Sequence, residues 1–261
     1  MPATLSQKVP PMSAPPLPER PAALMTPPVG AHEAALSAPR LTALDGAFLA
    51  QLALLVGCHI IAARYTLGWP SAAATDLLAL LVLAAMTVRR EWRPLLARLF
   101  VLGLAAGILE LATDAAGEQV AHSLRYPAGE PLLWGSPYYM PLSWAIVLTL
   151  LGYLAWRLRS LGPARMPLWL AVVLAGIFGA LMVPFYEEMA YYARWWQYTP
   201  VWRIGHTPVY VIVFEGLVAA ALPLLVAGLL ARPLRAAMMR GLLVGCWMPV
   251  AAFLAWFAIG R

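Results

Sequence analysis

The chain has 261 residues, of which 62% are apolar and only 11% are charged. Soluble domains carry about 25% charged residues, so the composition excludes an ordinary water-soluble domain. The net charge is +6, but the arginines flank apolar segments, which is typical of membrane topology and does not indicate nucleic-acid binding. Lys8 is the only lysine, which excludes a buried lysine that binds retinal or a pyridoxal cofactor.

Residues 1–40 contain ten of the 24 prolines of the chain. Such a composition buries too little apolar surface to offset the entropy lost on ordering, so we expect a disordered Pro/Ala-rich tail. Residues 41–261 are then expected to form one transmembrane helical domain.

Seven apolar runs follow the tail, each long enough to cross the roughly 30 Å hydrocarbon layer as a helix. Helices satisfy their own backbone groups in lipid, so we predict an all-α, polytopic helical bundle. The predicted spans are approximately 44–64, 71–88, 95–116, 137–156, 167–188, 207–230 and 237–259.

The basic residues gather on one side of these spans, because thirteen of eighteen lie in the tail or in every second loop after it. The positive-inside rule then places the N-terminus in the cytoplasm and the C-terminus outside a bacterial-type cytoplasmic membrane. Eight of the twelve carboxylates show the opposite bias and fall in the outer half of the membrane or beyond it.

Glu110, Asp114, Glu118 and His122 are spaced by four residues, which places them on one face of the third predicted helix. An ionisable group inside a span costs at least about 2.5 kcal/mol, so Glu110 and Asp114 are expected to face a protein interior or a wet cavity. A simpler alternative is that the four groups pair with arginines and cap the bundle. We favour this alternative for Glu118 and His122, and a functional role for Glu110.

Two further elements bring carboxylates into the same half of the membrane, next to many Tyr and Trp side chains. The predicted catalytic residues are Glu110, Asp114, Glu187, Glu188 and Glu215. The predicted substrate-binding residues are Tyr126, Tyr138, Tyr139, Trp144, Tyr191, Trp196, Tyr198, His206 and Tyr210. An aromatic belt at the lipid interface explains some of these aromatic residues, but their density exceeds what a belt requires.

Acids inside an aromatic wall favour carbocation chemistry. A carboxylic acid that an apolar site keeps protonated can give its proton to a carbon–carbon double bond, and aromatic faces stabilise the resulting cation. We therefore expect a cofactor-free membrane enzyme that protonates an isoprenoid-type lipid, leading to cyclisation, hydration or isomerisation. Glu110 is the expected proton donor, with Asp114 tuning it and Glu187 or Glu215 as a second acid or base.

The stretches 107–144 and 184–217 share one pattern. Each has an acid near the end of a helix, an aromatic loop and a helix expected to start at a proline, Pro137 or Pro208. This pattern indicates an internal repeat whose two halves face a shared cavity.

A small set of glycine, aromatic, acidic and proline positions resembles the pattern of a known family. These positions are Gly107, Glu110, Tyr126, the stretch 137–144, Trp196, Tyr198, Gly205, Pro208 and Gly216. Over roughly 103–217, the chain resembles the membrane carotenoid-biosynthesis proteins, which include carotenoid hydratases and, more remotely, small membrane lycopene cyclases. The resemblance implies a polyene substrate and a lyase or isomerase activity. The cyclases carry Pro-x-Glu-Glu after a Trp-x-Tyr, whereas here the paired Glu187 and Glu188 precede it.

Three other functions remain open on the sequence. A metal-dependent enzyme is the first, because the carboxylates and imidazole on the third helix, together with His206, are side-chain types that bind iron, manganese or zinc. The Glu-x-x-His motif of di-iron bundles does not occur, and we predict no metal. A proton- or cation-coupled transporter would also use intramembrane carboxylates. A non-catalytic assembly protein is the third. The expected partners are the lipid bilayer and a hydrophobic small molecule, with no nucleic acid, and the oligomeric state is unknown.

Overall fold

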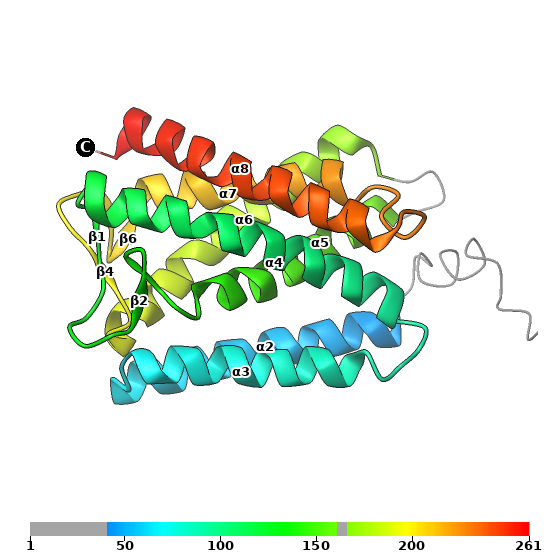
Figure 1. The fold of residues 1–261 in the computed structure, drawn as a ribbon, viewed down its shortest axis with the longest axis horizontal. Helices are drawn as coiled ribbons and strands as arrows, with labels where there is room; N and C mark the ends of the chain where they lie inside the picture. The colour runs from blue at the N-terminus through cyan, green and yellow to red at the C-terminus, as the bar shows by residue number, and fades with distance from the viewer. Residues whose placement is uncertain (1–40, 161–165, 261) are drawn as a thin grey trace, which may run out of the picture.

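The computed structural model describes residues 41–160 and 166–260, so the predicted tail at 1–40 lies outside the described residues. In the described part, seven helices are long and apolar enough to cross a membrane (Figure 1). They are α2 (Ala43–Tyr65), α3 (Trp69–Met86), α4 (Arg93–Ala115), α5 (Met140–Ser160), α6 (Leu168–Ala193), α7 (Val209–Val226) and α8 (Leu234–Ile259). The predicted seven-helix bundle is confirmed, and the protein is an integral, multi-pass membrane protein.

Three pairs of two-residue strands lie at one end of the bundle, on the left of Figure 1. The strands are β1 (Leu124–Arg125), β2 (Leu132–Leu133), β3 (Ser136–Pro137), β4 (Gln197–Tyr198), β5 (Arg203–Ile204) and β6 (Thr207–Pro208). β2 pairs with β3 and β5 pairs with β6 as hairpins, whereas β1 pairs antiparallel with the distant β4. The sequence predicts only that the loops after α4 and α6 lie outside the membrane. The structure joins these two loops through the β1–β4 pair.

The same order of elements occurs twice along the chain. A long helix, a strand, a hairpin and a second helix follow one another from α4 to α5, and again from α6 to α7. A Cβ built on Gly103 would lie 2.7 Å from the carbonyl oxygen of Ala145, and one on Gly176 would lie 3.3 Å from that of Gly216, so both helix pairs cross closely at a glycine. The predicted internal repeat is thus present in the fold.

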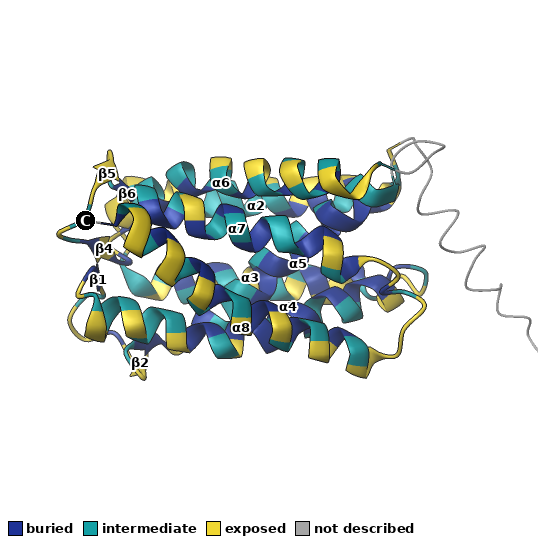
Figure 2. Ribbon diagram, turned by 90° about the horizontal axis from the view of Figure 1, so that it is seen from above, coloured by how far each residue is buried: buried dark blue, intermediate teal, exposed yellow. Residues whose placement is uncertain are grey.

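Of the three helices outside the repeat, α8 and α2 each pack along one of its halves, and α3 packs against α2. α8 packs along α4, and α2 packs along α6. Figure 2 shows buried residues turned toward the interior and exposed residues on the outward faces. Exposed side chains such as Leu181 and Phe257 are apolar, as expected of a surface that faces lipid.

The helix starts differ from the expectation at Pro137, which lies in strand β3, so α5 begins three residues later, at Met140. The reason is the hairpin, in which Pro137 pairs with Leu132 in the β2–β3 ladder. Pro208 lies in β6 and immediately precedes α7, so its predicted position at a helix start is nearly correct.

The end opposite the strands contains a buried ion pair. Arg157 of α5 donates to Oδ1 of Asp45 in α2 at 2.9 Å, and Tyr153 donates to the same oxygen at 2.7 Å. Asp45 also forms a capping box with Thr42 at the start of α2. These contacts join the first helix to the repeat, because α2 and α5 belong to different parts of the bundle.

Candidate functional site

A cavity of about 610 Å³ runs through the bundle and is lined mostly by apolar and aromatic side chains. Residues from α2, α4, α5, α6, α7 and α8 line it, so nearly every helix contributes a wall. Pockets of this size and character are usual for small-molecule ligands.

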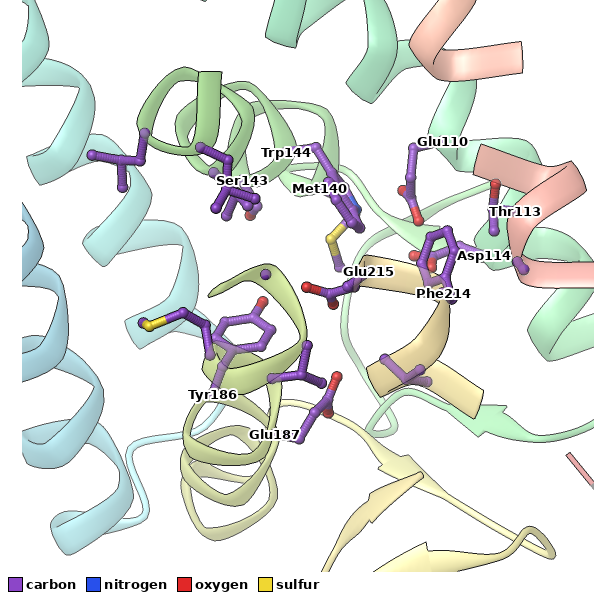
Figure 3. Close-up of a pocket in the computed structure, with 18 of the residues that line it drawn as sticks. Glu110, Thr113, Asp114, Met140, Ser143, Trp144, Tyr186, Glu187, Phe214 and Glu215 are labelled. Atoms are coloured by element: carbon purple, nitrogen blue, oxygen red, sulfur yellow. The ribbon is translucent and has the colours of Figure 1, made fainter. Parts of the chain in front are cut away.

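Four of the five predicted catalytic carboxylates point into this cavity (Figure 3). Glu110 and Asp114 lie one turn apart on α4, Glu187 lies on α6 and Glu215 lies on α7. The ion pairs of the described residues, Arg89–Glu91, Arg157–Asp45 and His206–Glu188, include none of the four. The acids therefore share an apolar site without a recorded ion-pair partner.

Glu110 is the most enclosed of the four, with only 1% of its surface exposed. Its Oε2 is buried and has no hydrogen-bond partner. An unpartnered buried polar atom is costly, and native structures usually retain one for a functional reason. Glu110 therefore brings an unpartnered acid oxygen to the cavity, close to the equally unpartnered hydroxyl of Thr113.

Asp114 is held by two hydroxyl groups from the segment that follows α4. The Tyr126 hydroxyl donates to its Oδ2 at 2.5 Å, and the Ser136 hydroxyl donates to the same oxygen at 2.6 Å. Tyr126 follows β1 and Ser136 belongs to β3, so the short strands fix the orientation of this carboxyl.

Glu187 is held in the same way by the segment that follows α6. The indole of Trp196 donates to its Oε2 at 2.8 Å, and the hydroxyl of Tyr198 donates to its Oε1 at 3.2 Å. Burial is the main cause that raises the pKa of the hydroxyls of Tyr126 and Tyr198, and neighbouring carboxyls raise it further. Both phenols therefore keep their protons and act as hydrogen-bond donors.

Aromatic side chains form much of the remaining wall. The rings of Trp144 and Phe214 meet edge to face with centroids 6.1 Å apart, beside the acids (Figure 3). Five predicted substrate-binding residues line the cavity, namely Tyr126, Trp144, Trp196, Tyr198 and Tyr210. Phe214 and Tyr186 also line it and were not among the predicted residues, although each is adjacent in sequence to a predicted acid.

Glu188, His206 and Tyr191 lie together outside the cavity. The backbone N–H of His206 donates to Oε1 of Glu188 at 2.6 Å, and His206 Nδ1 lies 2.8 Å from Oε2. The rings of Tyr191 and His206 stack with centroids 3.6 Å apart. Because consecutive residues of a helix point about 100° apart, Glu187 faces the cavity and Glu188 faces the β5–β6 hairpin.

The predicted stripe on the third helix continues only from Glu110 to Asp114. After Ala115 the helix changes to a π-helical turn, Ala116–Val120, and His122 has a positive φ of 51° outside the helix. Each step of four residues rotates by about 40° around an α-helix, so Glu118 and His122 drift off the face of Glu110, and Gly117 and Ala121 line the cavity instead.

The remaining two predicted residues lie outside the cavity. Tyr138 is exposed, whereas Tyr139 is buried and donates to Oε1 of Glu130 at 2.6 Å. Burial raises the pKa of Glu130 to about 7, and its Oε2 has no hydrogen-bond partner. Glu130 is a buried acid that sequence reasoning missed, because its loop position suggested an exposed carboxylate.

A second, small cavity of about 40 Å³ lies beside the first, between α2, α3 and α5. Asp76 and Tyr139 line it, and Ser143, which lines both cavities, donates a hydrogen bond to Asp76. Among the residues that the structure describes, no three His, Cys, Asp or Glu side chains are arranged to hold a metal ion.

The family model described as "Domain of unknown function (DUF6989)" matches residues 111–259, more than half of the chain. The chain therefore belongs to this family. The matched region begins next to Glu110 and contains all six short strands, Asp114, Glu187 and Glu215. Comparisons with curated proteins and with solved structures find no match.

Proposed function

We propose that the protein is a membrane enzyme that protonates a carbon–carbon double bond of an isoprenoid-type lipid. The observation that carries this proposal is the fully enclosed Glu110, whose Oε2 lacks a hydrogen-bond partner in a cavity with aromatic walls. A charged carboxylate in such a site would be strongly disfavoured without a cation, so the neutral acid is the form expected there.

The proton transfer uses groups already present in the cavity. The electron pair of the double bond takes the proton of Glu110, a C–H bond forms, and the neighbouring carbon becomes a cation. The faces of Trp144 and Phe214 beside the acids stabilise that cation. The carboxylate left on Glu110 is stabilised less than it would be in water, which favours return of a proton at the end of the cycle.

The cation then has two outcomes. Loss of a proton from a neighbouring carbon to a carboxylate gives an isomer with unchanged mass. If a second double bond of the same substrate first attacks the cation, a C–C bond closes a ring, the charge moves to the far carbon of that double bond, and loss of a proton from its neighbour gives a cyclised product with unchanged mass. Addition of water gives an alcohol, and the released proton passes to a carboxylate. Asp114, Glu187 and Glu215 line the same cavity as Glu110 and are the candidates to accept that proton.

The resemblance to carotenoid hydratases and lycopene cyclases supports a polyene as the substrate and a lyase or isomerase as the enzyme class. Conjugation spreads the positive charge of the intermediate over several carbons. The cation formed from a polyene therefore needs less stabilisation by the protein than the cation formed from an isolated double bond. The apolar lining of the cavity supports a hydrophobic small molecule drawn from the bilayer.

The location that we propose is a bacterial-type cytoplasmic membrane, with the strand clusters on the outer side. Arginines concentrate at the opposite end, around the α3–α4 turn and at the end of α5. The positive-inside rule places this end, and with it the start of α2, in the cytoplasm. Cys58 and Cys246 are first replaced by serine, and single cysteines are then introduced at Arg90 and at the exposed Ala128. Labelling with a membrane-impermeant maleimide in intact cells tests this orientation, and only Ala128→Cys should react.

The decisive experiment compares total lipid extracts of cells that express the wild type, Glu110→Gln or Glu118→Gln. Glu118 lies in the π turn and does not line the cavity, so Glu118→Gln is a control on a neighbouring carboxyl. We expect a lipid that differs from its precursor by water or by a rearrangement without change of mass. It should be present with the wild type and Glu118→Gln and absent with Glu110→Gln.

Identical extracts from all three strains, at equal expression and membrane insertion, would contradict the proposal. A proton- or cation-coupled transporter would then be the stronger explanation of the buried acids.

A further inference from the structure

The cavity continues past the acids in two directions. In one direction it reaches Leu49 and Leu52 of α2 and Phe178 of α6. In the other direction it reaches Val120 of the π turn and Phe253 of α8. Figures 1 and 2 both place α2 and α8 on opposite sides of the bundle.

Both ends of the cavity reach the apolar surface of the bundle. The exposed fraction is 58% for Leu49 at the α2 end, and 78% for Val120 and 61% for Phe253 at the α8 end. Glu110 and Glu187, which lie between these ends, are only 1% and 3% exposed. Asp114 and Glu215, which also line the cavity, are partly exposed, so the enclosed part is the one around Glu110 and Glu187.

The two ends follow from the internal repeat. α8 lies along α4 on one side, and α2 lies along α6 on the other, so each half of the repeat forms an opening with the helix that packs along it. Asp114 of α4 and Glu187 of α6 lie between these openings. Binding sites in membrane proteins built from internal repeats often lie at the interface between the repeats.

The carboxylate near the α2 end already has hydrogen-bond partners within the protein. Asp45 lines this part of the cavity, and its carboxylate accepts hydrogen bonds from Thr42, Tyr153 and Arg157. The α8 end is lined by apolar and aromatic residues such as Ala252 and Phe253. Both ends thus suit hydrocarbon better than a polar head group.

We propose that the cavity is a tunnel open to the bilayer on two sides, which holds a long, linear, acyclic lipid chain. The double bond that reacts is internal, so an apolar arm extends from the acids toward α2 and another toward α8. The position of the reacting bond rests on the proposed function, whereas the two-ended binding of a chain does not. Lateral entry from the bilayer follows, because both openings face lipid.

The test measures binding without turnover, in the Glu110→Gln background and in detergent micelles. Farnesene and squalene serve as a short and a long acyclic isoprenoid hydrocarbon, and native mass spectrometry counts the molecules bound. Leu52→Trp narrows the α2 arm and Ala252→Trp narrows the α8 arm. Leu78→Trp, on the exposed face of α3 away from the cavity, is the matched control.

We call Leu52→Trp and Ala252→Trp the plugs of the α2 and α8 arms. We expect each single plug to weaken squalene binding by at least about tenfold, while farnesene still binds in the arm left open. The double plug should abolish both, and Leu78→Trp should change neither. Loss of squalene binding with only one of the two plugs would show a dead-end cavity and overturn the proposal. Undiminished squalene binding with both single plugs would overturn it as well.

A folding control supports the binding test, and the lipid extracts separate this proposal from the proposed function. Each variant is compared with Leu78→Trp by thermal unfolding, and Leu49→Trp and Phe253→Ala provide a second narrowing and a widening at the two ends if a first variant does not fold. The lipid extracts decide the chemistry independently, because a tunnel can bind squalene in a protein that catalyses nothing.

Discussion

Asp114 of α4 and Glu187 of α6 occupy corresponding places in the two halves of the protein. Each accepts hydrogen bonds from the loop that follows its own helix, Asp114 from Tyr126 and Glu187 from Tyr198. The loops are themselves paired through β1 and β4, where Leu124 lies opposite Tyr198. The two carboxyls are therefore positioned by one connected cap rather than by two separate loops.

Removing the Tyr126 hydroxyl should destabilise the protein more than removing that of Tyr198. The Tyr126 hydrogen bond is 2.5 Å long and that of Tyr198 is 3.2 Å, and in either variant the carboxyl keeps one other donor, Ser136 for Asp114 and Trp196 for Glu187. A hydrogen bond to a charged or strongly polar partner contributes about 1.5–3 kcal/mol, and a long one contributes less. Thermal unfolding of Tyr126→Phe and Tyr198→Phe in one detergent checks the order, and an equal or reversed effect would contradict it.

Breaking the buried ion pair should be among the most destabilising single changes. Asp45→Asn leaves Arg157 beside a neutral amide, and removal of one partner from a buried pair costs about 3–5 kcal/mol. Glu91→Gln, in the exposed pair with Arg89, is the control and should cost no more than about 1 kcal/mol. Comparable unfolding temperatures for the two variants would show that the buried pair contributes little.

The close crossing of α4 and α5 should not tolerate a methyl group. In Gly103→Ala the new Cβ would lie 2.7 Å from the carbonyl oxygen of Ala145, and overpacking of this kind costs about 1–3 kcal/mol. Gly57→Ala in α2 is the matched control, since no atom lies within 4 Å of its Cβ position. We expect a lower unfolding temperature for Gly103→Ala only, and unchanged stability would mean that the helices can separate without cost.

Glu130 should make the stability of the wild type depend on pH. Burial raises its pKa to about 7 in the folded protein, above the ordinary value of 4.5, so the folded state holds the proton more tightly than the unfolded state does. Its contribution is fully present below pH 4.5 and is lost as the pH rises toward about 7. The loss is about 1–3 kcal/mol after allowance for partial solvation.

Glu130→Gln removes this dependence, because glutamine does not titrate and still accepts a hydrogen bond from Tyr139. Unfolding temperatures of both proteins at pH 4.5 and pH 7.5 should differ in their change with pH, the wild type falling more steeply than the variant. Parallel changes in the two proteins would show that Glu130 is solvated in the folded state.

The amino-acid sequence by itself determined the membrane class, the seven spans and the presence of buried acids. These are local properties, because the length of an apolar run and the cost of a carboxyl group inside it do not depend on distant residues. Glu110 and Asp114 were found in this way, and both line the cavity. The repeat was also visible, since its two halves keep the same order of acids, aromatics and prolines.

Only the tertiary structure decided which of those groups face one another. Glu187 and Glu188 are equivalent by composition, and the rotation of α6 turns one to the cavity and the other to His206. Glu118 and His122 lie off the cavity face because steps of four residues drift by about 40° around a helix, and the structure showed where that face ends. The rotation of α6 has no local signal, because it is set by packing against residues far away in the chain.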